Sequence, residues 1–111
     1  MTAAETVSFS ADHRGDILVL RVAGELDMSS APDLLGHVDD PLAAGDTRIL
    51  GDLGELSFCD SAGLNAFIRG DRRCVRAGGW LRLTGAKGHV ARVLDVSGLG
   101  DVLAYRPEPA P

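Results

Sequence analysis

Apolar and polar positions alternate along this chain with two different periods, which predicts strands and helices in turn. Near the start, Glu5–Phe9 and Asp16–Ala23 are rich in β-branched and aliphatic residues, as strands are. The polar segment SADHRG between them is short enough for a hairpin and too short for the crossover that a parallel pair needs. We therefore expect these two strands to pair antiparallel.

A helix is predicted next, from the sequence Ser-Ala-Pro-Asp that begins at Ser30. The serine hydroxyl would cap the helix, the proline suits its first turn, and the carboxylate of Asp33 would lie near its positive end. Four apolar residues then recur at the spacing of one helix face: Ala31, Leu34, Leu35 and Val38. We expect the segment Pro41–Asp46 to break this helix.

The rest of the chain continues the alternation of strands and helices. The expected elements are a strand over Thr47–Leu53, a helix from Ala62 to the sequence Ala77-Gly78-Gly79, a strand over Trp80–Gly85, a short helix around Val90, Val93 and Leu94 that Gly98 ends, and a strand over Asp101–Tyr105. The apolar positions of the second helix are Leu64, Phe67, Ile68, Cys74 and Val75. Asp71 interrupts this apolar stripe and Gly70 weakens it.

This order, β-β-α-β-α-β-α-β, predicts a single α/β domain with a mixed, mostly parallel sheet and crossover helices. We expect the domain to cover residues 1–105 and a proline-rich, disordered tail to cover residues 106–111. In such sheets the loops that lead from strands to helices gather at one edge, where ligands and partners bind. Two of these loops, Gly24–Ser30 and Gly54–Gly63, are rich in polar side chains, so function is expected there.

Composition narrows the classes of partner. The 111 residues are 45% apolar and 24% charged, and the net charge of −5 argues against nucleic acid or anionic lipid as the main partner. We find neither a signal peptide nor an apolar run of the roughly 20 residues that span a membrane, so we expect a cytoplasmic protein without membrane contact. Cys59 and Cys74 lack CxxC spacing and a nearby pair of histidines, which predicts small buried residues, no metal site and no cofactor.

Ser61, within the segment LSFCDSAGL (Leu56–Leu64), has the most distinctive chemical setting in the chain. As a hydrolase nucleophile it would need a base, a group that orients the base and an oxyanion hole. No glycine stands two residues before the serine, so the segment is not a G-x-S-x-G elbow. Of the three histidines, His13, His37 and His89, only His89 is expected near the same edge of the sheet. Catalysis by Ser61 would require His89 within hydrogen-bonding reach.

Ser61 is also expected to cap the second helix. A serine at a helix start contributes about 1 kcal/mol by accepting a hydrogen bond from an otherwise unpaired N–H. Asp60 beside it favours the positive end of the helix. Ala62 and Gly63 leave the hydroxyl uncovered, so a larger molecule could reach it. A cap that is also accessible is a suitable acceptor for a phosphate group.

Two motifs and the order of elements resemble a known family. The segments are GELDMSSAPDL (Gly24–Leu34), the longer Leu50–Gly85 with its D-S-x-G-L string after a strand, and VARVLDVSGLGDVL (Val90–Leu103). Together they resemble the STAS-domain anti-sigma factor antagonists of bacteria, from Thr6 to about Tyr105. The D-S-x-G-L string is the most specific part of the resemblance, and the G-E-L-D string at the matching distance upstream supports it.

The resemblance implies a regulator rather than an enzyme. An unphosphorylated antagonist of this family docks on an anti-sigma factor that is also a serine kinase, which releases the sigma factor. The kinase then phosphorylates the serine of the D-S-x-G motif, here Ser61, and the complex dissociates. A serine phosphatase restores the active form. By position, the implied partner-binding residues are Asp27, Met28, Ser29, Asp60, Ala62 and Asn65.

The chain departs from the family pattern at two positions. Ala62 stands where the family often has a second hydroxyl, which leaves Ser61 as the sole acceptor in the motif. Cys59 stands where a larger aliphatic residue is usual. Two other interpretations stay open at this point. The first is a STAS subunit of a lipid-transport or stress-signalling assembly, in which the serine matters less. The second is a small serine hydrolase.

Overall fold

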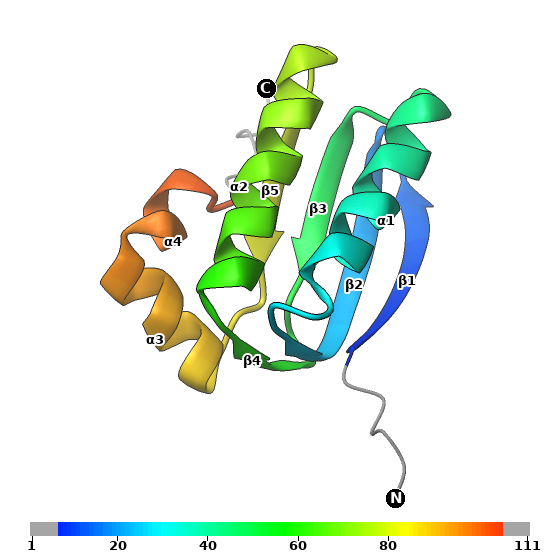
Figure 1. The fold of residues 1–111 in the computed structure, drawn as a ribbon. Coiled ribbons are helices and arrows are strands. Elements are labelled where there is room, and N and C mark those ends of the chain that lie inside the picture. Colours follow the sequence, from blue (N-terminus) through cyan, green and yellow to red (C-terminus); the bar gives the residue numbers. More distant parts are fainter. Residues whose placement is uncertain (1–6, 106–111) are drawn as a thin grey trace, which may run out of the picture.

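The computed structural model describes residues 7–105, in which a five-stranded sheet carries two long helices on one face (Figure 1). In chain order the elements are β1 (Val7–Arg14), β2 (Ile17–Leu26), α1 (Ala31–Ala43), β3 (Arg48–Asp52), β4 (Leu56–Cys59), α2 (Ser61–Arg76), β5 (Trp80–Thr84), α3 (Gly88–Ser97) and α4 (Leu99–Val102). The sheet order is β1-β2-β3-β5, and β4 pairs with β2 beyond the end of β3. Only β1 is antiparallel to its neighbour. The predicted mixed, mostly parallel α/β sheet is confirmed.

The apolar core lies between the sheet and the two helices that cover it, α1 and α2 (Figure 1). All four residues of the predicted apolar face of α1 are buried. In α2, Phe67 and Cys74 are buried, whereas Val75 is 55% exposed and therefore does not belong to the apolar face. Gly70 lets α2 pack closely, since a Cβ there would lie 3.1 Å from the side chain of Leu81 and 3.4 Å from that of Val38.

Asp71, the polar residue within the apolar stripe of α2, connects this helix to β5. Its Oδ1 accepts hydrogen bonds from the backbone N–H of Leu81 and from the guanidinium of Arg82, both at 2.9 Å. The half-buried carboxylate is thus satisfied, as buried polar groups generally are. Within residues 7–105, no helix is long and apolar enough to cross a bilayer.

The hairpin is tighter than predicted. β1 continues through the polar segment to Arg14, and only Gly15 and Asp16 separate it from β2, with Gly15 at a φ of +59°. Residues 11–14 are exposed at the edge of the sheet, where a strand needs no apolar pattern. The prediction of a loop over SADHRG was therefore wrong. Residues 5 and 6 of the first predicted strand lie outside the described residues.

Two further boundaries differ from the prediction. Pro41 lies within the last turn of α1, which ends at Ala43 instead of breaking before the proline. The predicted last strand, Asp101–Tyr105, is largely absent: Gly98, at a φ of +79°, ends α3, the short helix α4 follows, and only Ala104 forms an isolated bridge to β5. Residues 99–102 form α4 instead of a strand, and the chain meets β5 only at Ala104. The predicted tail, residues 106–111, lies outside the described residues.

Candidate functional site

The two loops that were predicted to carry function lie at the same edge of the sheet, because β2 and β4 are parallel neighbours (Figure 1). Leu26, the last residue of β2, pairs with Cys59, the last residue of β4. The backbone N–H of Asp60 donates to the carbonyl oxygen of Leu26 at 3.2 Å. Asp27 and Asp60 therefore follow adjacent strand ends. β4 itself was not predicted, since the whole segment Gly54–Gly63 was expected to be a loop.

Asp27 organises the first loop. Its Oδ1 accepts hydrogen bonds from the hydroxyl of Ser29 (2.7 Å), from the backbone N–H of Ser29 (3.0 Å) and from the backbone N–H of Ser30 (3.2 Å). These bonds, that of the Ser29 hydroxyl above all, hold the pKa of Asp27 below its usual range. The loop is thus built around an ionised carboxylate whose orientation is fixed.

Ser30 does not cap α1 as predicted. Its backbone has a helical conformation (φ −105°, ψ −12°), whereas a capping residue is normally extended, and its side chain bonds to no N–H of the helix. The Ser30 hydroxyl instead accepts a hydrogen bond from the backbone N–H of Asp27 at 3.0 Å and is buried. Hydrogen bonds between Asp27 and Ser30 therefore stabilise the loop between β2 and α1 from within.

Asp60, rather than Ser61, caps α2. The backbone of Asp60 is extended (φ −100°, ψ −173°), and its Oδ1 accepts a hydrogen bond from the backbone N–H of Gly63 at 3.0 Å. Ser61 is the first residue of the helix, so the prediction that it is the cap was wrong. Its side chain is exposed and forms no hydrogen bond with the described residues. The predicted accessibility of the Ser61 hydroxyl is confirmed.

Gly63 allows the first turn of α2 to lie directly against the strand ends. A Cβ at this position would lie 2.8 Å from Sγ of Cys59 and 3.0 Å from the side chain of Leu26. Cys59 is 2% exposed, and burial, together with the charge of Asp60, raises the pKa of its thiol to about 12. The neutral thiol is a packing group, and Cys74 is buried as well, so the predicted burial of both cysteines is confirmed.

Three of the predicted partner-binding residues, Met28, Ala62 and Asn65, line one groove between α1 and α2. The groove has a volume of about 490 Å³. Its other lining residues are Ala31, Pro32, Leu35, Gly36, Asp39, Ala66, Arg69 and Arg73. Met28 is 77% exposed at one end of the groove. The other three predicted residues, Asp27, Ser29 and Asp60, do not line the groove and belong to the loops at the edge of the sheet.

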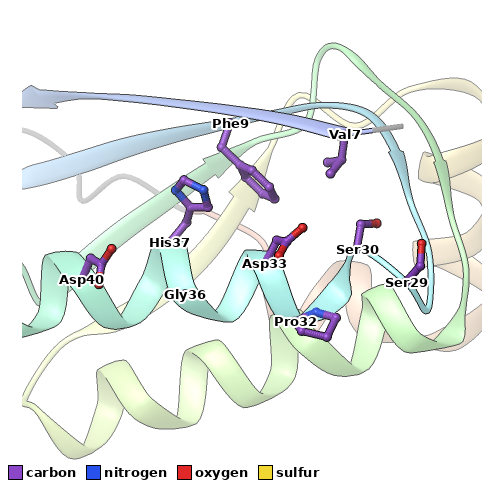
Figure 2. Close-up of a pocket in the computed structure, with 9 residues that line it drawn as sticks. All are labelled: Val7, Phe9, Ser29, Ser30, Pro32, Asp33, Gly36, His37 and Asp40. Atoms are coloured by element: carbon purple, nitrogen blue, oxygen red, sulfur yellow. The ribbon is translucent and has the colours of Figure 1, made fainter. Parts of the chain in front are cut away.

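A second groove, of about 530 Å³, lies on the other side of α1, between this helix and β1 (Figure 2). The rings of Phe9 from β1 and His37 from α1 stack within it, with their centroids 4.2 Å apart. Asp33 and Asp40 contribute carboxylates from α1, and Ser29 lies at the end nearest the loop between β2 and α1 (Figure 2). Ser61 does not line this groove, so the groove is separate from the exposed hydroxyl of Ser61.

His89 does not provide the base that a serine hydrolase would need. Its ring stacks on that of Phe58 in β4, with centroids 5.3 Å apart and planes inclined by 4°, and no hydrogen bond joins it to Ser61. His13 contacts the carboxylate of Asp46 at 3.0 Å, away from the site. Among the described residues, no three His, Cys, Asp or Glu side chains are grouped as metal ligands.

Sequence reasoning missed one exposed aromatic residue at this edge. Phe58 is 38% exposed although it lies two residues after the buried Leu56. Glu25 pairs with Phe58 while Gly24 pairs with Leu56, so Ser57 is an extra residue in the register and shifts the alternation of β4. The sequence carries no clear signal for this bulge.

The fold and the site together define a small α/β domain of the STAS type. Residues 9–104 match the family described as "Mlab, STAS domain". The anti-sigma-B factor antagonist of Bacillus subtilis (strain 168) is 36% identical over 93 residues, which cover 82% of each chain. The chain therefore belongs to the STAS-domain family of anti-sigma factor antagonists, as the sequence motifs implied.

Solved structures agree with this assignment. An anti-sigma factor antagonist from Mycobacterium paratuberculosis has the same fold, with a TM-score of 0.79 and 22% identity over 97% of this chain and 92% of its own. SpoIIAA in its unphosphorylated form is 26% identical, with a TM-score of 0.73 over 85% of this chain and 84% of its own. The Bacillus cell fate determinant SpoIIAA in its phosphorylated form is 25% identical, with a TM-score of 0.65 over 85% and 86%.

Proposed function

We propose that this chain is a cytoplasmic anti-sigma factor antagonist that is switched off by phosphorylation of Ser61. When unphosphorylated, it binds an anti-sigma factor that is also a serine kinase and so releases a sigma factor. The kinase phosphorylates Ser61, the complex dissociates, and a serine phosphatase restores the active form. The observation that carries this proposal is the exposed hydroxyl of Ser61, unbonded among the described residues, at the start of α2. A family member with a phosphorylated form supports it.

The contact surface would consist of the two loops and the end of the groove beside them. Its residues are Asp27, Met28, Ser29, Asp60, Ala62 and Asn65, around the acceptor. Ser61 is a substrate of the partner in this scheme, and the catalytic groups belong to the kinase. No histidine among the described residues activates the Ser61 hydroxyl for chemistry of its own.

The position of Ser61 explains how a phosphate could abolish docking without unfolding the domain. Phosphorylation adds about −1.5 to −2 charges at pH 7. The positive end of α2 tolerates negative charge, so the fold should persist. The phosphate on Ser61 would lie beside Asp60 and near the ionised Asp27, within a surface that must lose water on binding. Like-charge repulsion and the cost of desolvation then oppose the complex.

Intact-mass analysis tests the proposal. Wild-type chain, Ser61→Ala and Ser57→Ala are incubated with the cognate kinase and ATP. Ser57 is a matched control because it is exposed and lies four residues before the acceptor. We expect one phosphate on the wild type and on Ser57→Ala, and none on Ser61→Ala. Phosphate on Ser61→Ala would refute the site, and no phosphate on any chain would favour a STAS subunit of a larger assembly instead.

A further inference from the structure

We propose that the groove between α1 and α2 binds an acidic, amphipathic helix of the anti-sigma factor, and that Arg69 pairs with one carboxylate of that helix. This inference rests on the proposed function and adds the chemistry of the partner. Arg69 was not among the residues that the sequence singled out. It lines the groove about two helical turns from Ala62, at the end away from the acceptor.

The shape of the groove suits a helix. Small residues from both helices let another backbone approach closely: Ala31 and Gly36 from α1, and Ala62 and Ala66 from α2. Met28 adds exposed apolar surface for the partner's side chains, and the buried Leu35 lies at the floor of the groove. The groove runs from Ala62 to Arg73 along α2, which at 1.5 Å per residue is about 16 Å, or three turns of helix. Grooves between helices commonly accept the apolar face of an amphipathic helix.

The charges at the far end of the groove favour an acidic partner. Arg73 is already paired with Asp39, whose two oxygens lie 2.8 and 2.6 Å from its Nη1. Arg69 is exposed and belongs to none of the ion pairs that the described residues form. The groove therefore retains one unpaired positive charge, although the chain as a whole carries −5. A carboxylate is the complementary group, and such pairs fix the register of a complex.

The same charges argue against a nucleic acid in the groove. Binding to nucleic acid relies on several phosphate contacts, typically about 6–10 for a strong salt dependence. Here a single unpaired arginine lines the groove, and the ionised Asp27 directly precedes Met28 at its other end. A protein segment with an apolar face and one acidic position fits this distribution.

Two charge reversals on the same helix test the inference. Arg69→Glu changes the groove, and Arg72→Glu is the matched control because Arg72 is exposed and does not line it. Each new carboxylate lies four residues before an arginine, Arg73 or Arg76, so both variants place opposite charges at i and i+4 on α2. Affinity of the unphosphorylated chains for the cognate kinase is measured by calorimetry. We expect at least about fivefold weaker binding for Arg69→Glu and less than about twofold change for Arg72→Glu.

Each other result overturns the inference. Equal losses in both variants would mean diffuse attraction to the whole helix rather than a contact in the groove. Unchanged affinity in both would leave the groove unused, while the loss of binding on Ser61 phosphorylation would still uphold the proposed function. A wild-type dimer that Arg69→Glu dissociates would make a second copy the occupant. If the wild type binds no anti-sigma factor kinase, the proposed function fails and this inference fails with it.

Discussion

The carboxylate of Asp60 accepts a hydrogen bond from the backbone N–H of Gly63 at 3.0 Å, at the start of α2. Asp60 caps the helix, so Ser61 is not needed for that purpose. The Ser61 hydroxyl can therefore be modified without removing a structural hydrogen bond of the described residues. An exposed hydroxyl next to a separate helix cap suits the reversible phosphorylation that we propose for Ser61.

Removing the helix cap at Asp60 is expected to destabilise the domain, whereas removing the Ser61 hydroxyl is not. Asp60→Ala should lower the free energy of unfolding by about 1 kcal/mol, because the N–H of Gly63 loses its acceptor. Asp60→Asn keeps an oxygen at this position and should recover most of the loss. Ser61→Ala should stay within about 0.5 kcal/mol of the wild type. Urea denaturation measures all three, and an equal loss in Ser61→Ala would show that Ser61 shares the capping role.

The buried Gly63 is expected to be intolerant of a methyl group, unlike a glycine that is exposed. In Gly63→Ala the new Cβ would lie 2.8 Å from Sγ of Cys59, so the first turn of α2 must shift at a cost of about 1–3 kcal/mol. Gly36→Ala is the control, since its Cβ would meet no atom within 4 Å. That change should stabilise α1 by about 0.5–1 kcal/mol. Equal effects of the two variants in thermal unfolding would contradict the packing described for α2.

The two buried thiols should make the domain sensitive to alkaline pH. Burial raises the pKa of Cys59 from 9.0 to about 12 and that of Cys74 from 9.0 to about 11. Because the native state holds the thiols protonated, their contribution to stability is complete below pH 9 and is lost as the pH rises toward these values. The free energy of unfolding should fall by at most about 1.4 kcal/mol per pH unit for each thiol.

Urea unfolding between pH 8 and about 10.5 measures this effect. The chain suits the experiment because Lys87 is its only lysine and Tyr105 its only tyrosine, so few other groups titrate there. Replacement of both cysteines by alanine should flatten the dependence. The same slope in the double variant would assign the effect to other groups.

Asp27 should contribute to stability at neutral pH and lose that contribution in acid. Its hydrogen bonds with Ser29 and Ser30 lower its native pKa, so the charged form stabilises the folded state above the unfolded pKa. As the pH falls through the lowered native pKa, this contribution disappears. The difference in stability between wild type and Asp27→Ala should therefore be clear at pH 7 and shrink toward pH 3. A constant difference over this range would show that the charge of Asp27 does not matter to the loop.

Patterns in the sequence predicted most of the fold because most elements bury one face. The face of α1 from Ala31 to Val38 and the strand over Trp80–Thr84 follow directly from periodicity. The end of β1 at Arg14 could not be found in this way, because an edge strand has no buried face at that point. The strand expected near Tyr105 failed for a different reason, since a left-handed turn at Gly98 is compatible with either a strand or a helix afterwards.

The candidate site could be derived from the sequence in part, for similar reasons. The motif singled out Ser61 and its neighbours, and the predicted parallel topology brought the two loops to one edge, where the structure has them. Which of Asp60 and Ser61 caps the helix depends on the backbone angles at a single residue, and sequence alone does not fix these. The exposure of Phe58 and the position of Arg69 in a groove depend on packing between segments that are distant in the sequence.

Under the proposed function, phosphate on Ser61 abolishes docking while the fold persists. The most direct test compares the affinity of phosphorylated and unphosphorylated chain for the cognate anti-sigma factor kinase, with the melting temperature of both recorded. We predict at least about 100-fold weaker binding after phosphorylation, with a change in melting temperature of no more than about 3 °C. Equal affinity of the two forms would contradict the account. So would a loss of binding that is accompanied by a large drop in melting temperature.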